Sequence, residues 1–345
     1  MEMITKVNKQ IEKVILAGDM GGTKTELAIF RVSKKGLAGE IFSSTYINRD
    51  FETPENLLKE FFKKADFPAT SLSATVFGVA APVHEGRRTA LTNIDWTIET
   101  DEFQGLFGLK NFKLINDMAA NAYGISVLGD EDFFTLNKGV KRLGNSAIIS
   151  PGTGLGEAII YLDGETRKPI ATEGGHADFA PVNTVHIGLY CFLREKYGHV
   201  SYERILSGLG IKNIFDFLAS YDEVSKNVTK RLDKGEDPAL VISTEAMGDK
   251  ESGVCKESMK LFVSILGAEA GNLVLKSMAT GGLFIGGGIA PKILDILKGE
   301  DFLKAFTAKG RFKNFLFEVP VKVILNNRTA LLGAAKYGAD IINSK

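Results

Sequence analysis

Two glycine-rich segments carry residue types that suit phosphate binding. The first spans residues 18–25 (GDMGGTKT) and the second spans 151–156 (PGTGLG). Backbone N–H groups in a tight glycine turn can surround phosphate oxygens, and hydroxyl or ammonium groups beside the turn add further donors. A carboxylate next to the phosphates can also reach Mg²⁺ through water. The candidate nucleotide-binding residues are therefore Asp19, Gly21, Gly22, Thr23, Lys24, Gly152, Thr153 and Gly154, with Asp19 also the candidate magnesium residue.

Each glycine segment lies between two apolar runs. The first follows residues 14–17 (VILA) and precedes 26–30 (ELAIF), while the second follows 147–150 (AIIS) and precedes 157–161 (EAIIY). Both patterns predict a strand, a turn and a strand. The first segment nearly fits a P-loop, but Thr23 replaces the last glycine and no helix follows. A lone Gly-Gly turn is more often a plain hairpin turn. The second copy favours phosphate binding, because one phosphate chain can be held from both sides by two related lobes.

Asp117 lies between a predicted buried strand, 113–115, and a predicted helix, 118–125. A carboxylate in that position is most often a simple helix N-cap. Between two phosphate-binding lobes, the same carboxylate can accept the proton of a hydroxyl while a phosphoryl group is transferred to it. Asp117 is therefore the candidate general base of a kinase.

Two further segments carry groups that can hydrogen-bond the hydroxyls of a sugar. Residues 173–176 (EGGH) combine an acid, a flexible turn and an imidazole, and Glu203 lies in the segment 202–208 (YERILSG). A glutamate in a surface helix is usually only solvated, and a single histidine is more often a structural hydrogen-bond donor than a metal ligand. The candidate hydroxyl-binding residues are Glu173, His176 and Glu203.

A third glycine-rich segment, 281–291 (GGLFIGGGIAP), surrounds a short apolar strand. Backbone without side chains allows a flat ring or a ribose to approach closely. A tight connection from strand to helix explains one or two glycines but not three in a row. We therefore take Gly286, Gly287 and Gly288 as candidate residues for binding the nucleoside.

Strands and helices alternate between these segments. Residues 53–55 (TPE) are typical of a helix N-terminus, and 74–80 (ATVFGVA) indicate a buried strand. In the second half we expect helices at 202–206, 211–218, 237–247 and 252–278, the last with one apolar stripe, and a further helix opened by Pro291. Such alternation predicts an α/β protein whose sheets are covered on both faces.

The composition excludes several classes of partner and location. Lys+Arg and Asp+Glu both number 42, so there is no basic surplus to hold nucleic acid or an anionic membrane. The N-terminal residues lack the apolar segment of a secretory signal. No apolar run reaches the ~20 residues of a membrane span; the longest candidate is 279–290. Cys191 and Cys255 are too few for a zinc site or a disulfide framework. We expect a cytoplasmic protein with reduced thiols.

Together these motifs resemble one family, the bacterial-type glucokinases, within the superfamily of hexokinases, actin and Hsp70 chaperones. The resemblance runs from about Val14 to the C-terminus. Three segments are similar to the two phosphate motifs and the adenosine motif of the superfamily: 19–23, 152–156 and 283–291. Three others are similar to the segments that define the substrate of the glucokinases: 114–117 (LIND), 173–181 (EGGHADFAP) and 203–208 (ERILSG).

The resemblance implies roles for single residues. Asp117 would be the catalytic base, and Asn93 would lie in a loop over the sugar pocket, 92–96 (TNIDW). The implied sugar-binding residues are Asn93, Asn116, Asp117, Glu173, His176 and Glu203. Related repressor-type kinases carry a Cys-rich zinc loop after the histidine, and this sequence has none.

The resemblance also implies a fold. We expect a two-lobed hexokinase/actin-like (ribonuclease H-like) α/β fold, with a mixed sheet in each lobe and a cleft between them. The small domain would comprise residues 1–126 and 327–345, and the large domain 127–326. Sugar would lie in the cleft, and ATP would bind mainly to the large domain. Closure would expel water and align the sugar 6-hydroxyl with the γ-phosphate.

The expected reaction is ATP-dependent, Mg²⁺-assisted phosphorylation of glucose to glucose 6-phosphate, as in glycolysis, by a homodimer. One alternative is a kinase for another hexose, such as mannose or fructose, or for an N-acetylated amino sugar. ADP or polyphosphate could replace ATP as donor. Another alternative is a non-catalytic sugar sensor on the same fold, although the 13 residues before the first strand are too short for a DNA-binding helix-turn-helix.

Overall fold

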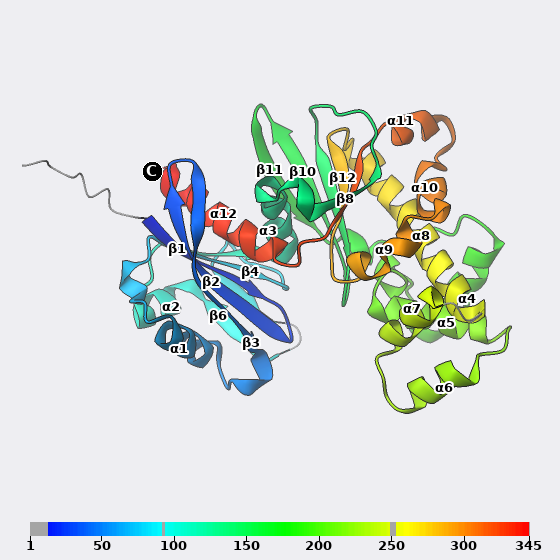
Figure 1. Ribbon diagram of the computed structural model, residues 1–345, viewed down its shortest axis with the longest axis horizontal. Helices are drawn as coiled ribbons and strands as arrows, with labels where there is room; N and C mark the ends of the chain where they lie inside the picture. The colour runs from blue at the N-terminus through cyan, green and yellow to red at the C-terminus, as the bar shows by residue number, and fades with distance from the viewer. Residues whose placement is uncertain (1–12, 92–93, 249–252, 345) are drawn as a thin grey trace, which may run out of the picture. The chain divides into compact units, whose positions relative to one another are not determined.

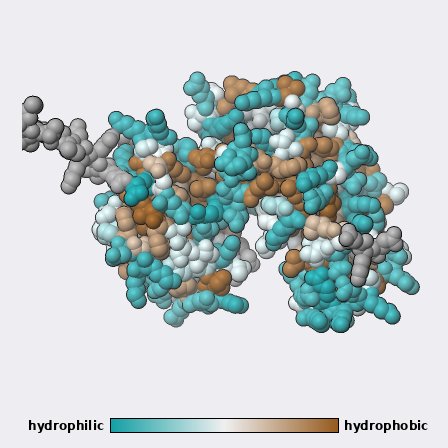
Figure 2. Space-filling model, in the orientation of Figure 1, coloured by the Kyte–Doolittle hydropathy of each residue, from teal (hydrophilic) through white to brown (hydrophobic). Residues whose placement is uncertain are grey.

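The computed structural model describes residues 13–91, 94–248 and 253–344 (Figure 1). The chain divides into two compact units: unit 1 comprises Met1–Leu128 and Arg328–Lys345, and unit 2 comprises Gly129–Asn327. Each unit contains a mixed β-sheet with helices, which confirms the expected α/β class. Hydrophilic side chains cover much of the face of each unit seen in Figure 2.

The sheet of unit 1 has five strands in the order β3-β2-β1-β4-β7. They are β1 Lys13–Met20, β2 Lys24–Ser33, β3 Gly36–Ile47, β4 Ala74–Val79 and β7 Phe112–Asn116. The predicted hairpin β1–β2 is antiparallel, whereas β1, β4 and β7 run parallel. Register pairs Asp19 with Gly78, and Val79 with Asn116. The carboxyl ends of these three strands therefore meet at one edge of the sheet.

Helices cover both faces of this sheet. On one face α1 (Pro54–Ala65), capped by Thr53 as predicted, packs with α2 (Thr100–Phe107) in an apolar core. On the other face α12 (Thr329–Asn343) packs against the opposite side chains of β1, β2 and β4. The remaining short elements are β5 Arg88–Ala90, β6 Thr97–Glu99, η1 Asn48–Asp50, η2 Ala69–Ser71 and η3 Ile125–Val127.

Helix α3 (Asp117–Gly124) is fixed by a close crossing with α12. A Cβ atom on Gly333 would collide with the carbonyl oxygen of Ala120, and one on Gly124 would collide with that of Thr329. Two glycines thus bring the helix backbones together, which no other residue type permits at this spacing. The crossing holds α3, and with it the N-terminal residue Asp117, against the parallel part of the sheet.

Unit 2 has a six-stranded sheet in the order β11-β10-β9-β12-β13-β8. The strands are β8 Phe133–Asn137, β9 Ser146–Pro151, β10 Leu155–Asp163, β11 Thr166–Thr172, β12 Gly282–Ile285 and β13 Val321–Ile324. The second predicted hairpin, β9–β10, is present and antiparallel, while β9, β12 and β13 run parallel. The turn after β9 and the glycines after β12 therefore lie at the same edge of the sheet.

The helices of unit 2 gather around α8, which packs against α5, α7, α10 and strand β9 (Figure 1). They are α4 Thr184–Tyr197, α5 Gly208–Ala219, α6 Lys226–Asp233, α7 Pro238–Met247, α8 Gly253–Ser277, α9 Leu294–Leu297, α10 Glu300–Thr307 and α11 Lys313–Phe317. Short 3₁₀ turns are η4 Asp130–Asp132, η5 Gly174–His176, η6 Tyr202–Arg204, η7 Ala290–Ile293 and η8 Gly310–Phe312.

Helix α8 is the most apolar long helix of unit 2. It is long and apolar enough to cross a membrane by length and composition alone, but 67% of its most apolar window is buried inside the protein, as in the core helix of a globular domain. The expected single stripe is too narrow, because Cys255, Ile265 and Glu269 are buried as well. A helix buried on most sides is typical of the core of a large domain.

Two predicted helices are shorter than expected. Residues 202–206 form only the 3₁₀ turn η6, because Ser207 is extended and caps the next helix, its Oγ accepting the N–H of Gly210. Glu203 therefore lies on a tight turn and not on a surface helix. Pro291 begins no long helix either: it lies in η7, which leads into the four-residue helix α9.

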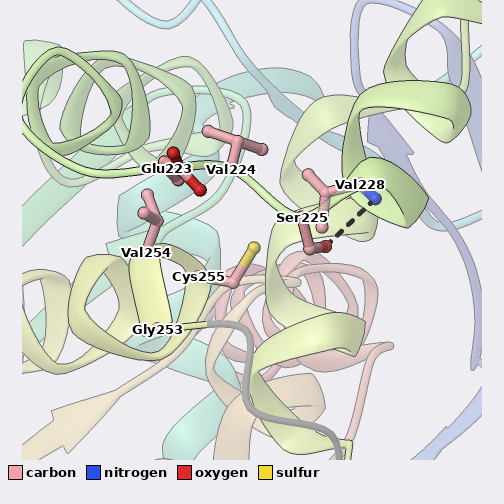
Figure 3. Close-up of a pocket in the computed structure, with 7 residues that line it drawn as sticks. All are labelled: Glu223, Val224, Ser225, Val228, Gly253, Val254 and Cys255. Atoms are coloured by element: carbon pink, nitrogen blue, oxygen red, sulfur yellow. Dashed lines mark hydrogen bonds between the residues drawn. The ribbon is translucent and has the colours of Figure 1, made fainter.

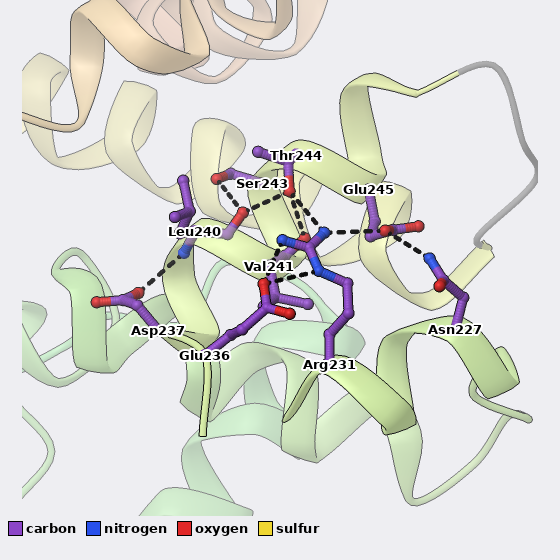
Figure 4. A network of polar contacts seen from close by, with 9 residues as sticks. All are labelled: Asn227, Arg231, Glu236, Asp237, Leu240, Val241, Ser243, Thr244 and Glu245. Atoms are coloured by element: carbon purple, nitrogen blue, oxygen red, sulfur yellow. Dashed lines mark hydrogen bonds and ion pairs between the residues drawn. The ribbon is translucent and has the colours of Figure 1, made fainter. Parts of the chain in front are cut away.

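The charged segment after α5 folds back onto unit 2 through a polar network (Figure 4). Arg231 of α6 donates to Glu236 at 2.9 and 2.8 Å and to Glu245 of α7 at 3.0 Å. Asn227 also donates to Glu245, at 2.8 Å. These bonds join α6 to α7 and explain why the segment is rich in charge.

A small cavity of about 160 Å³ lies at the base of this segment (Figure 3). It is lined by Glu223, Val224, Ser225, Val228, Gly253, Val254 and Cys255. None of these residues belongs to the motifs that suggested chemistry, so the candidate site is elsewhere in the molecule.

Candidate active site

The first glycine turn connects β1 and β2 in unit 1 and is held by Asn48. The side-chain amide of Asn48 donates to the Gly21 carbonyl at 2.8 Å, and its oxygen accepts the hydroxyl of Thr25 at 2.8 Å. Its backbone N–H donates to Thr23 at 2.9 Å. Asn48 and Thr25 are both buried, whereas Thr23 and Lys24 are exposed. The turn is thus fixed from behind, with its exposed side chains available to a ligand.

Carboxylates gather at the edge where β1, β4 and β7 end. Burial first, and then the nearby charges of Asp117 and Glu26, raise the pKa of Asp19 to about 6, while Lys24 opposes them. Glu26, opposite Asp19 in the hairpin, is paired with Arg328 at 2.7 Å. Asp19 and Asp117 therefore belong to one acidic group, which we call the acid edge.

The helix cap next to Asp117 is supplied by its neighbour. Asn116 Oδ1 accepts the N–H of Met118 at 2.8 Å and that of Ala119 at 3.3 Å. Asp117 is the first residue of α3 and is half-buried, with Oδ1 2.8 Å from the same Met118 nitrogen. Because Asn116 serves as the cap, capping alone does not account for the carboxylate at 117.

The second glycine turn, between β9 and β10 in unit 2, is held by Glu203. Glu203 Oε2 accepts the N–H of Leu155 at 3.0 Å, and a Cβ atom on Gly154 would collide with the same oxygen. Gly152 donates to the carbonyl of Gly154 at 2.8 Å and accepts the N–H of Gly208 at 2.9 Å. Gly154 is thus required for the carboxylate to reach the turn.

The three candidate hydroxyl-binding residues of unit 2 lie together. His176 Nε2 is 4.0 Å from Glu173 Oε2, and its Nδ1 is 4.0 Å from Glu203 Oε1. Glu173 and His176 are well exposed, with side chains 72% and 61% accessible, whereas Glu203 is 32% accessible. Two carboxylates flanking an imidazole present several acceptors and donors to a polyhydroxyl ligand. We call these residues the sugar cluster.

The third glycine segment follows β12 and lies beside the second turn. Gly287 has a φ of +78°, and a Cβ there would collide with the carbonyl of Pro151. Gly286 donates to Ile149 at 2.9 Å, and Gly287 and Gly288 are exposed. A bare backbone therefore adjoins the end of β9, where the second turn begins.

The structure brings together most of the predicted residues within each unit. Asp19, Asn116 and Asp117 share the acid edge of unit 1; the sugar cluster and two glycine segments share one edge of unit 2. Asn93 lies outside the described residues. Sequence reasoning missed Asn48, since nothing in its local sequence distinguishes it from a loop asparagine.

The part of the chain that the structure describes contains no cluster of metal ligands. Within 13–91, 94–248 and 253–344, no group of three or more His, Cys, Asp or Glu side chains could hold a metal ion. Magnesium commonly uses one or two carboxylates together with water and phosphate oxygens.

Known proteins match this chain over almost its whole length. The family model described as Glucokinase matches residues 16–341. A glucokinase of Nostoc punctiforme is 37% identical over 337 residues, covering 93% of this chain and 98% of the relative. The crystal structure of a glucokinase from an Antarctic psychrotroph is 27% identical with a TM-score of 0.79, covering 95% and 99%. A ROK-family glucokinase from Streptomyces griseus, solved with glucose and AMPPNP, is 21% identical with a TM-score of 0.60, covering 94% and 99%.

Proposed function

The chain belongs to the glucokinase family, and on that premise we propose which of its residues carry out the reaction. The reaction is the ATP-dependent phosphorylation of glucose. We assign it to the 6-hydroxyl, with Asp117 as general base. The observation that supports this base is the acid edge: Asp117 begins α3 beside Asp19, where three parallel strands end, while Asn116 provides the cap. Ligands of open α/β sheets bind at such carboxyl ends.

Transfer of the O6 proton to Asp117 accompanies transfer of the phosphoryl group to O6. Asp117 accepts the proton as the O6–H bond breaks and the bond from O6 to the γ-phosphorus forms. The bond from that phosphorus to the β,γ-bridging oxygen breaks, and ADP leaves. A positioned base of this kind contributes about 10²–10⁴-fold to the rate.

The sugar cluster would hold the remaining hydroxyls. Glu173 and Glu203 accept hydrogen bonds from sugar hydroxyls, and His176 lies between them to donate or accept one. Asn116 already uses its oxygen as the cap, so its Nδ2 is the atom that would donate to a hydroxyl. Asn93 keeps the role that the family resemblance implies.

The glycine turns would hold ATP. Gly21, Gly22, Thr23 and Lys24 in unit 1, and Gly152, Thr153 and Gly154 in unit 2, supply backbone and side-chain donors to phosphate oxygens. The exposed backbone at Gly287 and Gly288 suits the nucleoside. Phosphoryl transfer depends chiefly on such positioning and on neutralising charge.

The acid edge suits Mg²⁺. The raised pKa of Asp19 reflects burial and repulsion by Asp117 and Glu26, which a nearby divalent cation relieves. Bound magnesium neutralises charge on the transferring phosphoryl group. Asp19 would reach the ion through water, the other ligands coming from ATP and solvent.

A panel of hexoses and phosphoryl donors tests the assignment. Glucose with ATP should give the highest kcat/KM in an assay coupled to ADP release, above mannose, fructose and N-acetylated amino sugars. ADP or polyphosphate should not replace ATP. Turnover of another hexose with higher kcat/KM would reassign the substrate, and binding of glucose without any turnover would indicate a sugar sensor.

A second test addresses the sugar cluster alone. Glu173→Gln should raise the KM for glucose and leave the KM for ATP unchanged, because the amide is a poorer acceptor for a hydroxyl. An unchanged KM for glucose would remove Glu173 from the site. Glu165→Gln, an exposed change on the hairpin β10–β11, serves as the matched control.

We also propose that the enzyme is cytoplasmic, takes part in glycolysis and acts as a homodimer that binds neither nucleic acid nor membrane. The balanced charge supports the last two points. Light scattering after gel filtration should give twice the chain mass of 37.4 kDa.

A further inference from the structure

Glu157 is a buried carboxyl group directly behind the turn that carries Glu173 and His176. It lies on β10 and is only 2% exposed. Its Oε1 has no hydrogen-bond partner among the residues that the structure describes. Its Oε2 lies so close to the turn that a Cβ atom on Gly174 would collide with it. The carboxyl group therefore packs against the backbone of the turn itself.

The backbone around Glu157 is joined to the same turn. Glu157 pairs with Thr172 across β10 and β11, and the Thr172 hydroxyl donates to the Glu157 carbonyl at 3.0 Å. That hydroxyl also accepts the N–H of Gly174 at 3.2 Å. Any displacement of Glu157 is thus passed to Gly174 through bonded neighbours as well as through direct contact.

A second buried carboxylate faces Glu157 from helix α8. Glu269 is fully buried and accepts the side-chain amide of Asn272 at 2.8 Å, with Lys276 3.5 Å away. A buried carboxylate with a lysine and an amide donor is stabilised as an anion. Glu269 therefore has both an amide donor and a lysine beside it, whereas no described residue forms an ion pair with Glu157.

Two other titratable groups complete the surroundings. Tyr202, next to Glu203, bonds Glu269 and accepts from Asn272 at 3.1 Å; burial, then the charge of Glu269, raises its pKa. Lys309 donates to the Asn272 oxygen at 2.6 Å, and burial lowers its pKa. These groups face Glu269 and Asn272 and do not hydrogen-bond Glu157.

These surroundings favour the protonated form of Glu157. Burial first, and then the charge of Glu269, raise the pKa of Glu157 to about 7, while Lys276 opposes them. The folded protein thus holds a proton on Glu157 up to nearly neutral pH. Above that pH, two adjacent buried negative charges would lie behind the turn, and one of them would lack a donor.

We propose that protonated Glu157 is a positioning residue that supports the turn 174–176 and so couples glucose affinity to pH. When Glu157 ionises, its charge must be solvated or moved away from Glu269, and its Oε2 already lies against the backbone of Gly174. The turn then shifts, and Glu173 and His176 lose their arrangement. This inference rests on the proposed role of these two residues in holding the sugar.

The direction of the effect follows from the proton. The form that binds glucose well carries the proton, so affinity is highest below about pH 7 and falls as the pH rises. If only the protonated form bound, the Kd for glucose would rise about 30-fold between pH 6 and 8.5, from the fraction protonated at each pH. Several-fold is the smallest rise that supports the proposal.

Calorimetric titration of glucose without nucleotide, from pH 5.5 to 8.5, tests this coupling. Glu157→Gln keeps the shape and the neutral charge of the protonated acid, so its Kd should stay flat and low. Glu165→Gln, on the same hairpin but exposed, should follow the unmodified enzyme. A flat profile in the unmodified enzyme, or a sloping one in E157Q, would overturn the proposal.

Further measurements cover two cases: that E157Q fails to fold, and that Glu173 and His176 do not hold the sugar. Infrared difference spectra at pH 6 should show the carbonyl stretch of a buried protonated acid, absent in E157Q. If E157Q fails to fold, Glu269→Gln replaces it. Removing the charge of Glu269 lowers the pKa of Glu157, so the rise in Kd should shift to lower pH. A shift to higher pH would contradict the proposal. If Glu173→Gln weakens glucose binding while E157Q keeps the slope, only this inference fails. If Glu173→Gln has no effect, the proposed sugar cluster fails.

Discussion

The two glycine hairpins, β1–β2 and β9–β10, share a pattern of strand, turn and strand but are supported by different chemistry. In unit 1 a neutral amide, Asn48, holds the turn through Gly21 and Thr25. In unit 2 a carboxylate, Glu203, holds the turn through the N–H of Leu155. Asn48 is buried, whereas Glu203 is 32% accessible and 4.0 Å from His176.

This difference separates two ways of supporting a glycine turn. In unit 1 the support and the acid edge are distinct: Asn48 holds the loop, and Asp19 and Asp117 form the acid edge. In unit 2 the support is itself a member of the sugar cluster, because one oxygen of Glu203 contacts the turn while the other lies near His176. We therefore expect changes in unit 1 to affect single functions, and changes around Glu203 to affect sugar and nucleotide together.

The largest effect should come from Asp117→Asn. The amide cannot accept the hydroxyl proton, so kcat should fall about 10²–10⁴-fold, while the Kd for glucose changes little. The helix should remain intact, since Asn116 supplies the cap. The coupled ADP-release assay measures the first quantity and calorimetry the second. Asp101→Asn, exposed on α2, is the control. Near-normal kcat in D117N would exclude Asp117 as the base.

Asp19→Asn should stabilise the protein while impairing its activity. The pKa of Asp19 rises from 3.8 to about 6 on folding, so the folded state binds the proton more tightly and stability falls as pH rises between these values. The substitution removes this penalty, which reaches about 1.5 kcal/mol at pH 5 and about 3 kcal/mol at pH 7.5. Urea unfolding at the two pH values measures the difference. If the gain in the free energy of unfolding does not increase with pH, ionised Asp19 does not destabilise the folded protein.

The elements that carry the glycine turns could be predicted from the sequence because each is a local pattern. Alternating apolar runs around a glycine turn require no long-range information, and Thr53-Pro54 marks a helix start by itself. The predicted helix at 202–206 was wrong for the opposite reason. A short apolar pattern there suits a helix, but Ser207 caps the next helix and Glu203 bonds Leu155, which is 48 positions away.

The candidate site was predictable where residue types cluster in sequence and not where they meet only in space. The EGGH turn and the Asn116-Asp117 pair are contiguous, so their chemistry is visible in the chain. Asn48 and Glu157 are single residues whose importance comes from contacts with Gly21 and Gly174. No local pattern marks either of them, because burial and partners are set by the folded sheet.

Asn48→Ala should test whether support of the first turn is separate from sugar binding. The change leaves the Thr25 hydroxyl and the Gly21 carbonyl without their partner, which costs about 2 kcal/mol of stability. The KM for ATP should rise several-fold, with an unchanged Kd for glucose. Asn56→Ala, exposed on α1, is the control for both measurements. A parallel loss of glucose affinity in N48A would mean that the two hairpins do not differ as proposed.

Gly154→Ala and Gly152→Ala form the matched pair for the second turn. The methyl group at 154 would collide with Glu203 Oε2, whereas the one at 152 would meet nothing within 4 Å. G154A should therefore displace Glu203 and raise the KM values for glucose and ATP together, by about tenfold, or about 1.4 kcal/mol. G152A places its methyl where phosphate would lie, so it should raise only the KM for ATP. Steady-state kinetics with each substrate varied in turn measures both. If G154A leaves the KM for glucose unchanged, Glu203 supports the turn without binding sugar, and the second hairpin works like the first.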